Sequence, residues 1–213
     1  MMGNGNVTIR VKPIPHSQVE PFDPLPGNRL MEHQHLIIIP YTHLPPSQSR
    51  KSSPNPETQC NHSLAKQGMD IVLISRNMSK LEAVSEALEK THQVKTVIIE
   101  ADFTDPSPKM YNHIKKELAD LEPPPLVLVN NVGMSYPYPE YFLDLPDRDQ
   151  RFMDIINCNI LSVTNMCKMI IPYMFDNNKG VVINISSTAA LIPSPMLTVY
   201  AASKVGFHIF PPY

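Results

Sequence analysis

From Ser63 onward, short apolar runs alternate with amphipathic stretches. The runs "MDIVLIS", "VKTVIIEA", "LVLVNN" and "GVVINISS" are almost continuously apolar and rich in β-branched residues, which predicts buried strands. Between them, "NMSKLEAVSEALEK", "MYNHIKKELADL" and "SVTNMCKMIIPYM" repeat apolar residues every three or four positions, which predicts helices, and "VYAASKVGFHIF" predicts a last one. Strands that alternate with helices are typical of a parallel sheet covered on both faces. We therefore expect a doubly wound α/β fold.

Residues 1–62 have a different composition. The chain holds 23 prolines and only 7 glycines, and the prolines gather in this segment, where they oppose helix formation. Only "VTIRV" and "LIIIP" could be extended strands. We interpret 1–62 as a Pro-rich, disordered leader, in preference to a ligand for proline-binding modules, and 63–213 as the α/β domain.

Charge and cysteine content exclude several function classes. A net charge of −2 gives no basic surface for nucleic acid, and the three cysteines show no spacing typical of disulfides or zinc. His33 and His35 could ligate a metal, but no further ligand stands near them, so we interpret them as surface residues and predict no metal site. No apolar run near the N-terminus reaches the roughly 20 residues of a membrane span, and we find no signal peptide.

Small polar or charged residues follow each predicted strand. Polar residues at strand ends often do no more than lead into turns. The carboxyl ends of parallel strands meet at one edge of the sheet, and such sheets bind ligands there. Four successive sets of small polar or charged residues at this edge therefore favour a binding site over residues that only lead into turns. The sets are Ser75, Arg76 and Asn77; Ala101 and Asp102; Asn130, Asn131 and Gly133; and Asn184, Ser186 and Ser187.

Tyr200 and Lys204 lie four positions apart, on one face of the last predicted helix. A lysine ammonium near a phenol favours loss of the phenolic proton, so Tyr200 could exchange a proton near neutral pH. The hydroxyl of Ser187 could hydrogen-bond a carbonyl oxygen at the same place. This spacing alone is common by chance, but its position after a strand that ends in Ser187 predicts proton donation to a carbonyl group.

The segments "LVNNVG", "NCNI", "NISS" and "YAASK", in this order and spacing, resemble the short-chain dehydrogenase/reductases. The longer segments "VLISRNMSKLEAV", "EADFT", "NNVGMSYPYPEYFLDLPD" and "NILSV" resemble the 17β-hydroxysteroid dehydrogenase type 3 and type 12 branch more closely. The likeness runs from about Ser63 to Phe210. It implies a Rossmann-like sheet and an NADP-dependent oxidoreductase that associates with the endoplasmic reticulum membrane.

The resemblance also implies residue roles. Tyr200 would be the general acid in ketone reduction, and Lys204 would make it a better acid and hold the nicotinamide ribose. Ser187 would bind the substrate carbonyl, and Asn159 of "NCNI" would hold a water in the proton relay.

The cofactor implied is NADPH. Arg76 stands where NAD-specific folds carry an acid for the ribose hydroxyls, and an arginine there suits a 2′-phosphate. Asp102 would meet the adenine. The other expected cofactor residues are Ser75, Asn130, Asn131 and Gly133, together with Tyr200 and Lys204.

The sequence departs from the family pattern in two places. The family opens with a strand and a glycine-rich turn, TGxxxGxG, whose backbone cradles the pyrophosphate, but no glycine occurs between Gly27 and Gly68. Leu36–Ile39 is the one comparable apolar run upstream and is our candidate for the central slot of the sheet. The later strands and the substrate-covering segment of the family are also missing, so we expect an incomplete sheet, truncated at both ends.

The leading functional hypothesis is NADPH-dependent reduction of a 17-ketosteroid. The alternative is a very-long-chain 3-oxoacyl-CoA reductase of fatty acid elongation, and from another class, an inactive isoform that acts only through protein contacts. We expect no turnover from these 213 residues by themselves. A homodimer is possible, and without an anchor the chain could be cytoplasmic.

Overall fold

The computed structural model describes residues 35–39, 56–192 and 194–206. Most of the predicted leader, including "VTIRV" and His33, lies outside these ranges. The described part of the chain forms one unit within residues 31–213.

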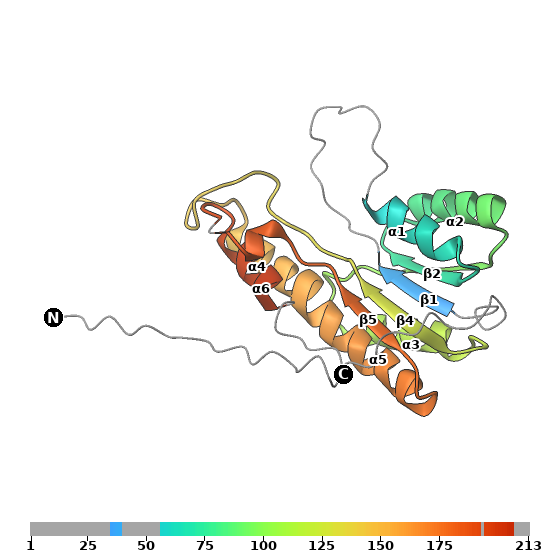
Figure 1. The fold of residues 1–213 in the computed structure, drawn as a ribbon. Coiled ribbons are helices and arrows are strands. Elements are labelled where there is room, and N and C mark those ends of the chain that lie inside the picture. Colours follow the sequence, from blue (N-terminus) through green and yellow to red (C-terminus); the bar gives the residue numbers. More distant parts are fainter. Residues whose placement is uncertain (1–34, 40–55, 193, 207–213) are drawn as a thin grey trace, which may run out of the picture. The chain divides into compact units, whose positions relative to one another are not determined.

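Within the described residues, five parallel strands form the sheet, in the order β3-β2-β1-β4-β5 (Figure 1). They are β1 (His35–Ile39), β2 (Asp70–Ser75), β3 (Thr96–Glu100), β4 (Pro125–Asn130) and β5 (Val181–Asn184). The doubly wound parallel sheet predicted from the sequence is therefore confirmed.

The central strand, β1, comes from the segment suggested for this slot. His35 pairs with Asp70 of β2 on one side and with Pro125 of β4 on the other, with a register irregularity after His35. Helix α1 also begins before residue 63, at Pro56. The sheet domain thus extends further toward the N-terminus than the boundary drawn from the sequence.

Helices cover both faces of the sheet. Alternate residues of β2 point to opposite sides: Ile71 and Leu73 pack in the core under α1 and α2, whereas Val72 and Ile74 pack in the core under α3, α4 and α5. The helices are α1 (Pro56–Ala65), α2 (Met78–His92), α3 (Pro108–Ala119), α4 (Arg148–Ile156), α5 (Ser162–Asp176) and α6 (Thr198–Val205).

Local sequence explains several helix ends. The side chain of Asn77 accepts a hydrogen bond from the Lys80 amide and caps α2, and Ser107 caps α3 in the same way through Met110. Gly68 has a φ of +82°, a left-handed conformation that glycine adopts without strain, just after α1.

A π-helix (Asn157–Leu161) joins α4 to α5, so that Arg148–Asp176 is one helical segment of 29 residues. The sequence predicted only its second half. By length and composition this segment could cross a membrane, but half of its most apolar window is buried inside the protein. Ile155, Met166 and Ile170 belong to the core beneath the sheet.

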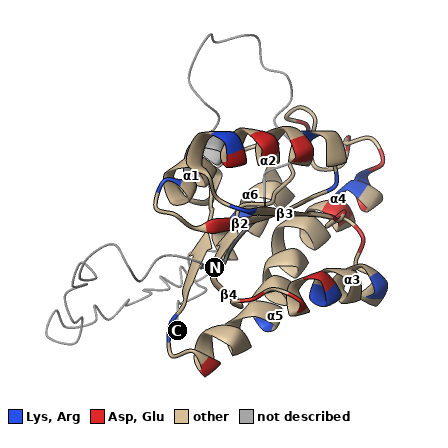
Figure 2. Cartoon of the chain, turned by 90° about the vertical axis from the view of Figure 1, so that its right-hand side faces the viewer, with Lys and Arg blue, Asp and Glu red and all other residues tan. Residues whose placement is uncertain are grey.

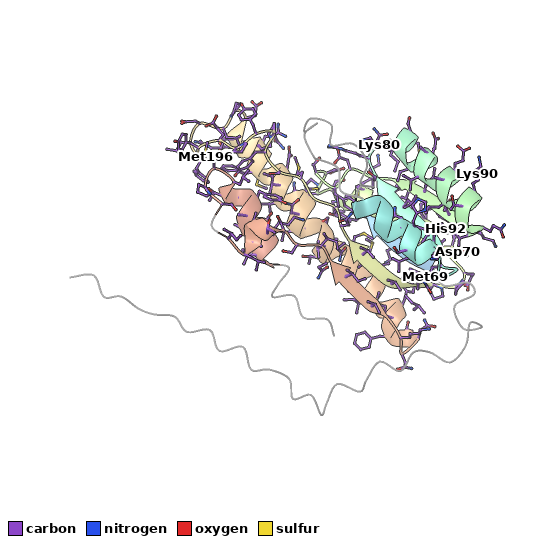
Figure 3. The ribbon with its side chains drawn as sticks, turned by 45° about the horizontal axis from the view of Figure 1, so that its top comes forward. Met69, Asp70, Lys80, Lys90, His92 and Met196 are labelled. Atoms are coloured by element: carbon purple, nitrogen blue, oxygen red, sulfur yellow. The ribbon has the colours of Figure 1, made fainter. Side chains whose placement is uncertain are left out.

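The outer surfaces of α2 and α3 carry both positive and negative side chains (Figure 2), as is typical of helices with one solvent-facing side. At its end, α2 is held to α1 by a hydrogen bond of 2.8 Å between the rings of His92 and His62. Figure 3 labels His92 at this end of α2 and Asp70 at the start of β2. The Asp70 carboxylate accepts a hydrogen bond from the Lys95 amide.

Candidate active site

The carboxyl ends of β2, β3, β4 and β5 meet at one edge of the sheet. Backbone pairing continues just past the strands: the Ala101 amide donates to the Ser75 carbonyl and the Ile185 amide donates to the Asn130 carbonyl, each at 3.0 Å. The predicted polar sets therefore lie at the same edge, two on each side of β1.

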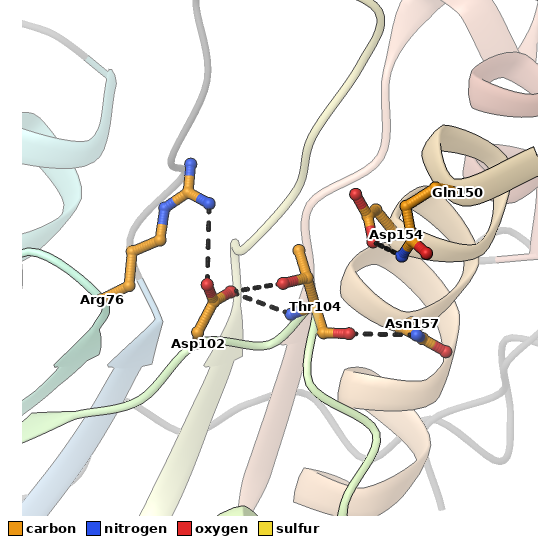
Figure 4. A network of polar contacts seen from close by, with 6 residues as sticks. All are labelled: Arg76, Asp102, Thr104, Gln150, Asp154 and Asn157. Atoms are coloured by element: carbon orange, nitrogen blue, oxygen red, sulfur yellow. Dashed lines mark hydrogen bonds and ion pairs between the residues drawn. The ribbon is translucent and has the colours of Figure 1, made fainter. Parts of the chain in front are cut away.

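Arg76 and Asp102 form an ion pair after β2 and β3, with Arg76 Nη1 3.8 Å from Asp102 Oδ2 (Figure 4). Asp102 Oδ1 also accepts hydrogen bonds from the amide and the hydroxyl of Thr104. Both charged side chains are about a third or more exposed, at 33% and 45%, so this pair adds little to stability and remains accessible to a ligand.

The network reaches the π-helix through Thr104. Its carbonyl oxygen accepts a hydrogen bond of 3.0 Å from Asn157 Nδ2 (Figure 4). Asn157 lies two positions before Asn159, so the loop after β3 is tied to the segment that carries a predicted catalytic residue.

Asn130 ends β4 as a buried residue. Its Nδ2 donates to Asn184 Oδ1 of β5 at 2.9 Å, whereas its Oδ1 is buried and accepts no hydrogen bond from the described residues. A buried acceptor in this state is uncommon in proteins. Asn131 and Gly133, the other residues predicted here, follow β4 as half-buried and buried positions.

Asn159 is completely buried and uses its whole side-chain amide. Oδ1 accepts from the Met134 amide at 2.8 Å, and Nδ2 donates to the Met134 carbonyl and to Ser203 Oγ. Ser203 in turn donates to the Tyr200 carbonyl at 2.7 Å. This chain of hydrogen bonds connects the segment after β4 to α6.

Lys204 docks α6 onto the end of β5. The residue is 1% exposed, and Nζ donates to the Ile185 carbonyl at 3.3 Å. Ser186 Oγ donates to the Lys204 carbonyl at 2.9 Å. Ser187 Oγ accepts from the Ala189 amide and caps a short 3₁₀ helix, and both Ser187 and Tyr200 are half-buried.

Burial lowers the pKa of Lys204 from its ordinary 10.5 to about 8, because the ammonium ion loses hydration. Burial also raises the pKa of the neighbouring Cys158 thiol to about 12, so this cysteine stays neutral. Perturbed pKa values cluster at functional sites, so the lowered pKa makes Lys204 a candidate for one.

The lowered pKa predicts how stability depends on pH. Between about pH 8 and 10.5 the unfolded chain binds more protons at Lys204 than the folded chain does, so the free energy of unfolding should rise with pH. Over this range, the free energy of unfolding of the wild type should rise by about 3 kcal/mol relative to that of Lys204→Met. Urea unfolding of both proteins at several pH values measures the difference, and parallel profiles would contradict it.

Three residues of this site were not predicted from the sequence: Ser203, Asn157 and Tyr136, whose hydroxyl accepts from the Val199 amide of α6. Ser203 lies next to the predicted Lys204, and Asn157 lies two positions before the predicted Asn159. This proximity to predicted residues is the signal that could have identified them. Nothing in the residues around Tyr136 indicates a contact with a helix more than sixty positions away.

A family model described as short chain dehydrogenase matches residues 58–211. The very-long-chain 3-oxoacyl-CoA reductase of Homo sapiens is 48% identical over 147 residues, which are 69% of this chain and 46% of the human protein. The very-long-chain 3-oxoacyl-CoA reductase-B of Danio rerio is 46% identical over the same length. The chain thus spans about half the length of the curated relatives it matches.

Solved structures with the same fold have lower identity. A short-chain dehydrogenase from Sphingobium yanoikuyae, solved with NADPH, has a TM-score of 0.66 at 21% identity and covers 83% of this chain and 62% of its own. A metagenomic short-chain oxidoreductase, solved with NADP, has a TM-score of 0.68 at 21% identity, and the match covers 84% of this chain and 73% of the oxidoreductase.

Proposed function

Because the chain belongs to the short-chain dehydrogenase family, we propose that its sheet edge binds NADPH and carries the groups that reduce the 3-oxo group of a very-long-chain acyl-CoA. The observation that carries this proposal is the docking of α6. Lys204 contacts the end of β5 and Ser203 contacts Asn159, so the helix that carries Tyr200 is held at this edge, which supports the proposal.

Several described residues fit a nicotinamide dinucleotide. Arg76 is partly exposed and would hold the 2′-phosphate, with Asp102 beside it for the adenine. The unused buried Oδ1 of Asn130 offers an acceptor, and Ser75, Asn131 and Gly133 lie at the same edge. NADPH, when bound, would supply the hydride. Residues 40–55, which follow β1, contain no glycine, so this chain lacks the family's turn for the pyrophosphate.

The chain's own residues would handle the proton and the carbonyl oxygen. Tyr200 would donate a proton to that oxygen, and Ser187 would donate a hydrogen bond to it. The Lys204 ammonium would favour the phenolate left behind and contact the nicotinamide ribose. Because the Asn159 amide is already engaged with Met134 and Ser203, its role would be to hold α6, and any relay water would use other atoms.

The substrate class proposed here reverses the order favoured by the sequence, which placed a 17-ketosteroid first. The relatives that match at 46–48% identity are named as very-long-chain 3-oxoacyl-CoA reductases, in both mammals and fish. They support the acyl-CoA alternative and an endoplasmic reticulum location by family.

Arg76 should set the cofactor preference. In a chain whose residues 40–55 are replaced by a TGxxxGxG turn, called the turn-replaced version below, Arg76→Ala should weaken NADPH binding about tenfold or more. NADH affinity should barely change, because NADH lacks the 2′-phosphate. Calorimetric titration with both cofactors measures the ratio of the two affinities. Lys80→Ala, which removes an exposed cation on α2, is the matched control, and an unchanged ratio in Arg76→Ala would refute the assignment.

The activity is tested on an extended version, which is the turn-replaced version continued by the C-terminal remainder of the human relative. We expect NADPH oxidation that depends on a long-chain 3-oxoacyl-CoA and is much slower with androstenedione or estrone. A preference for the steroids would restore the first hypothesis. Cofactor binding without ketone-dependent oxidation of NADPH would favour the non-catalytic isoform.

A further inference from the structure

Helix α6 has only eight residues and no cap of its own. Its N-cap position is Leu197, whose side chain cannot accept a hydrogen bond, so the first amides of the helix need acceptors from elsewhere. Isolated helices of this length are not stable in water. The position of Tyr200 and Lys204 therefore depends on what holds α6 from outside.

Tyr136 provides an acceptor at this end of α6. It lies in the loop after β4, the residue is 5% exposed, and its hydroxyl oxygen accepts a hydrogen bond of 3.0 Å from the Val199 amide. Burial raises the pKa of Tyr136, while hydrogen bonds from the Val199 and Tyr200 backbone act in the opposite direction. The hydroxyl is thus neutral at physiological pH and directed at the first turn of α6.

The Tyr136 ring is itself held in place. It packs against the Phe152 ring of α4 with a centroid separation of 6.1 Å, and Phe152 in turn packs against Phe142 at 4.9 Å. The same loop is joined to the segment before α6 by a second contact, in which the Glu140 amide donates to the carbonyl of Met196, labelled in Figure 3. These contacts fix the hydroxyl relative to α4 and the start of α6.

We propose that Tyr136 is a positioning residue whose hydroxyl caps α6 from a different part of the chain and so fixes Tyr200 and Lys204. The far end of α6 is held by Lys204 at Ile185 and by Ser203 at Asn159. Tyr136 holds the opposite end, so the helix is fixed on both sides of Tyr200. The inference rests on the proposed function only for the roles of Tyr200 and Lys204.

Tyr136→Phe tests the proposal in the unaltered chain without cofactor, because it removes the hydroxyl and keeps the ring. Amide hydrogen exchange within Thr198–Val205 should become about tenfold faster, the size expected for loss of a helix cap. Exchange in α2 and β2 should stay unchanged. Tyr138→Phe is the matched control, because Tyr138 lies in the same loop and is 49% exposed.

A second measurement separates positioning from general stability. Titration of the Lys204 ammonium by NMR should give a pKa of about 8 in the wild type and in Tyr138→Phe. In Tyr136→Phe it should move toward the ordinary lysine value, because a loosened α6 lets water reach Nζ. Unchanged exchange in α6 with an unchanged Lys204 titration would overturn the proposal. Equally faster exchange in α2, β2 and α6 would also overturn it, because Tyr136 would then support the whole fold.

Discussion

Tyr200→Phe should lower ketone reduction by the extended version by about 10²- to 10⁴-fold, the range typical for loss of a general acid. Phenylalanine keeps the ring but removes the only proton that this side chain can donate. The hydrogen bonds that hold this part of α6 use backbone groups and not the Tyr200 hydroxyl: the Tyr200 carbonyl accepts from Ser203 Oγ, and the Val199 amide donates to Tyr136. The fold of α6 should therefore survive, and steady-state kinetics with a 3-oxoacyl-CoA would measure the loss.

NADPH affinity gives the control for this prediction. The dissociation constant of Tyr200→Phe should stay within about fivefold of the parent, since one hydrogen bond contributes on the order of 1 kcal/mol or less when water can replace it. Tyr173→Phe on α5, away from the strand ends, should leave turnover unchanged. Equal losses of NADPH affinity and turnover in Tyr200→Phe would show that Tyr200 has a structural role instead.

The second large effect concerns the segment between β1 and α1. Replacing residues 40–55 with a TGxxxGxG turn should raise NADPH affinity at least tenfold, because glycines allow the backbone to approach the pyrophosphate and present its amides. The present segment has four prolines, which lack an amide hydrogen, and no glycine. Calorimetric titration of the two proteins with NADPH measures the change.

A turn with alanine in place of each glycine is the matched control. It has the same length and should restore little affinity, because the added Cβ atoms keep the phosphates away from the backbone. If the alanine turn raised NADPH affinity as much as the glycine turn, the shorter connection would be the cause of the higher affinity. If neither turn changed the affinity, NADPH would not bind at the end of β1.

The sequence predicted the sheet well because its strands are continuous apolar runs. Ile71 to Ile74 are fully buried on both faces of β2, and such runs are read directly from the sequence. The central position of β1 was harder to predict, because five residues cannot specify their neighbours. The suggestion rested on the absence of any other apolar run upstream, and the pairing of β1 with β2 and β4 confirms it.

The segment before α5 was missed for a physical reason. In "DRDQRFMDIINCNI", polar and charged residues interrupt the apolar pattern, and Asn157 and Asn159 are buried although they are polar. Their burial is stabilised by partners distant in sequence, the Thr104 carbonyl for Asn157 and Met134 and Ser203 for Asn159. Periodicity cannot reveal such partners, and the same limit applies to the contact between Tyr136 and α6.

NMR titration of the unaltered, isotope-labelled chain with NADPH tests the location of the site most directly, because it detects even weak binding. We expect saturable shifts in the amides that follow the strands, at Arg76, Asp102, Asn131 and Ile185, and in the Lys204 ammonium, with smaller shifts at the same concentrations of NADH. Shifts confined to α1 and α2 away from the strand ends, or no saturable shift at millimolar NADPH, would contradict the proposed cofactor site.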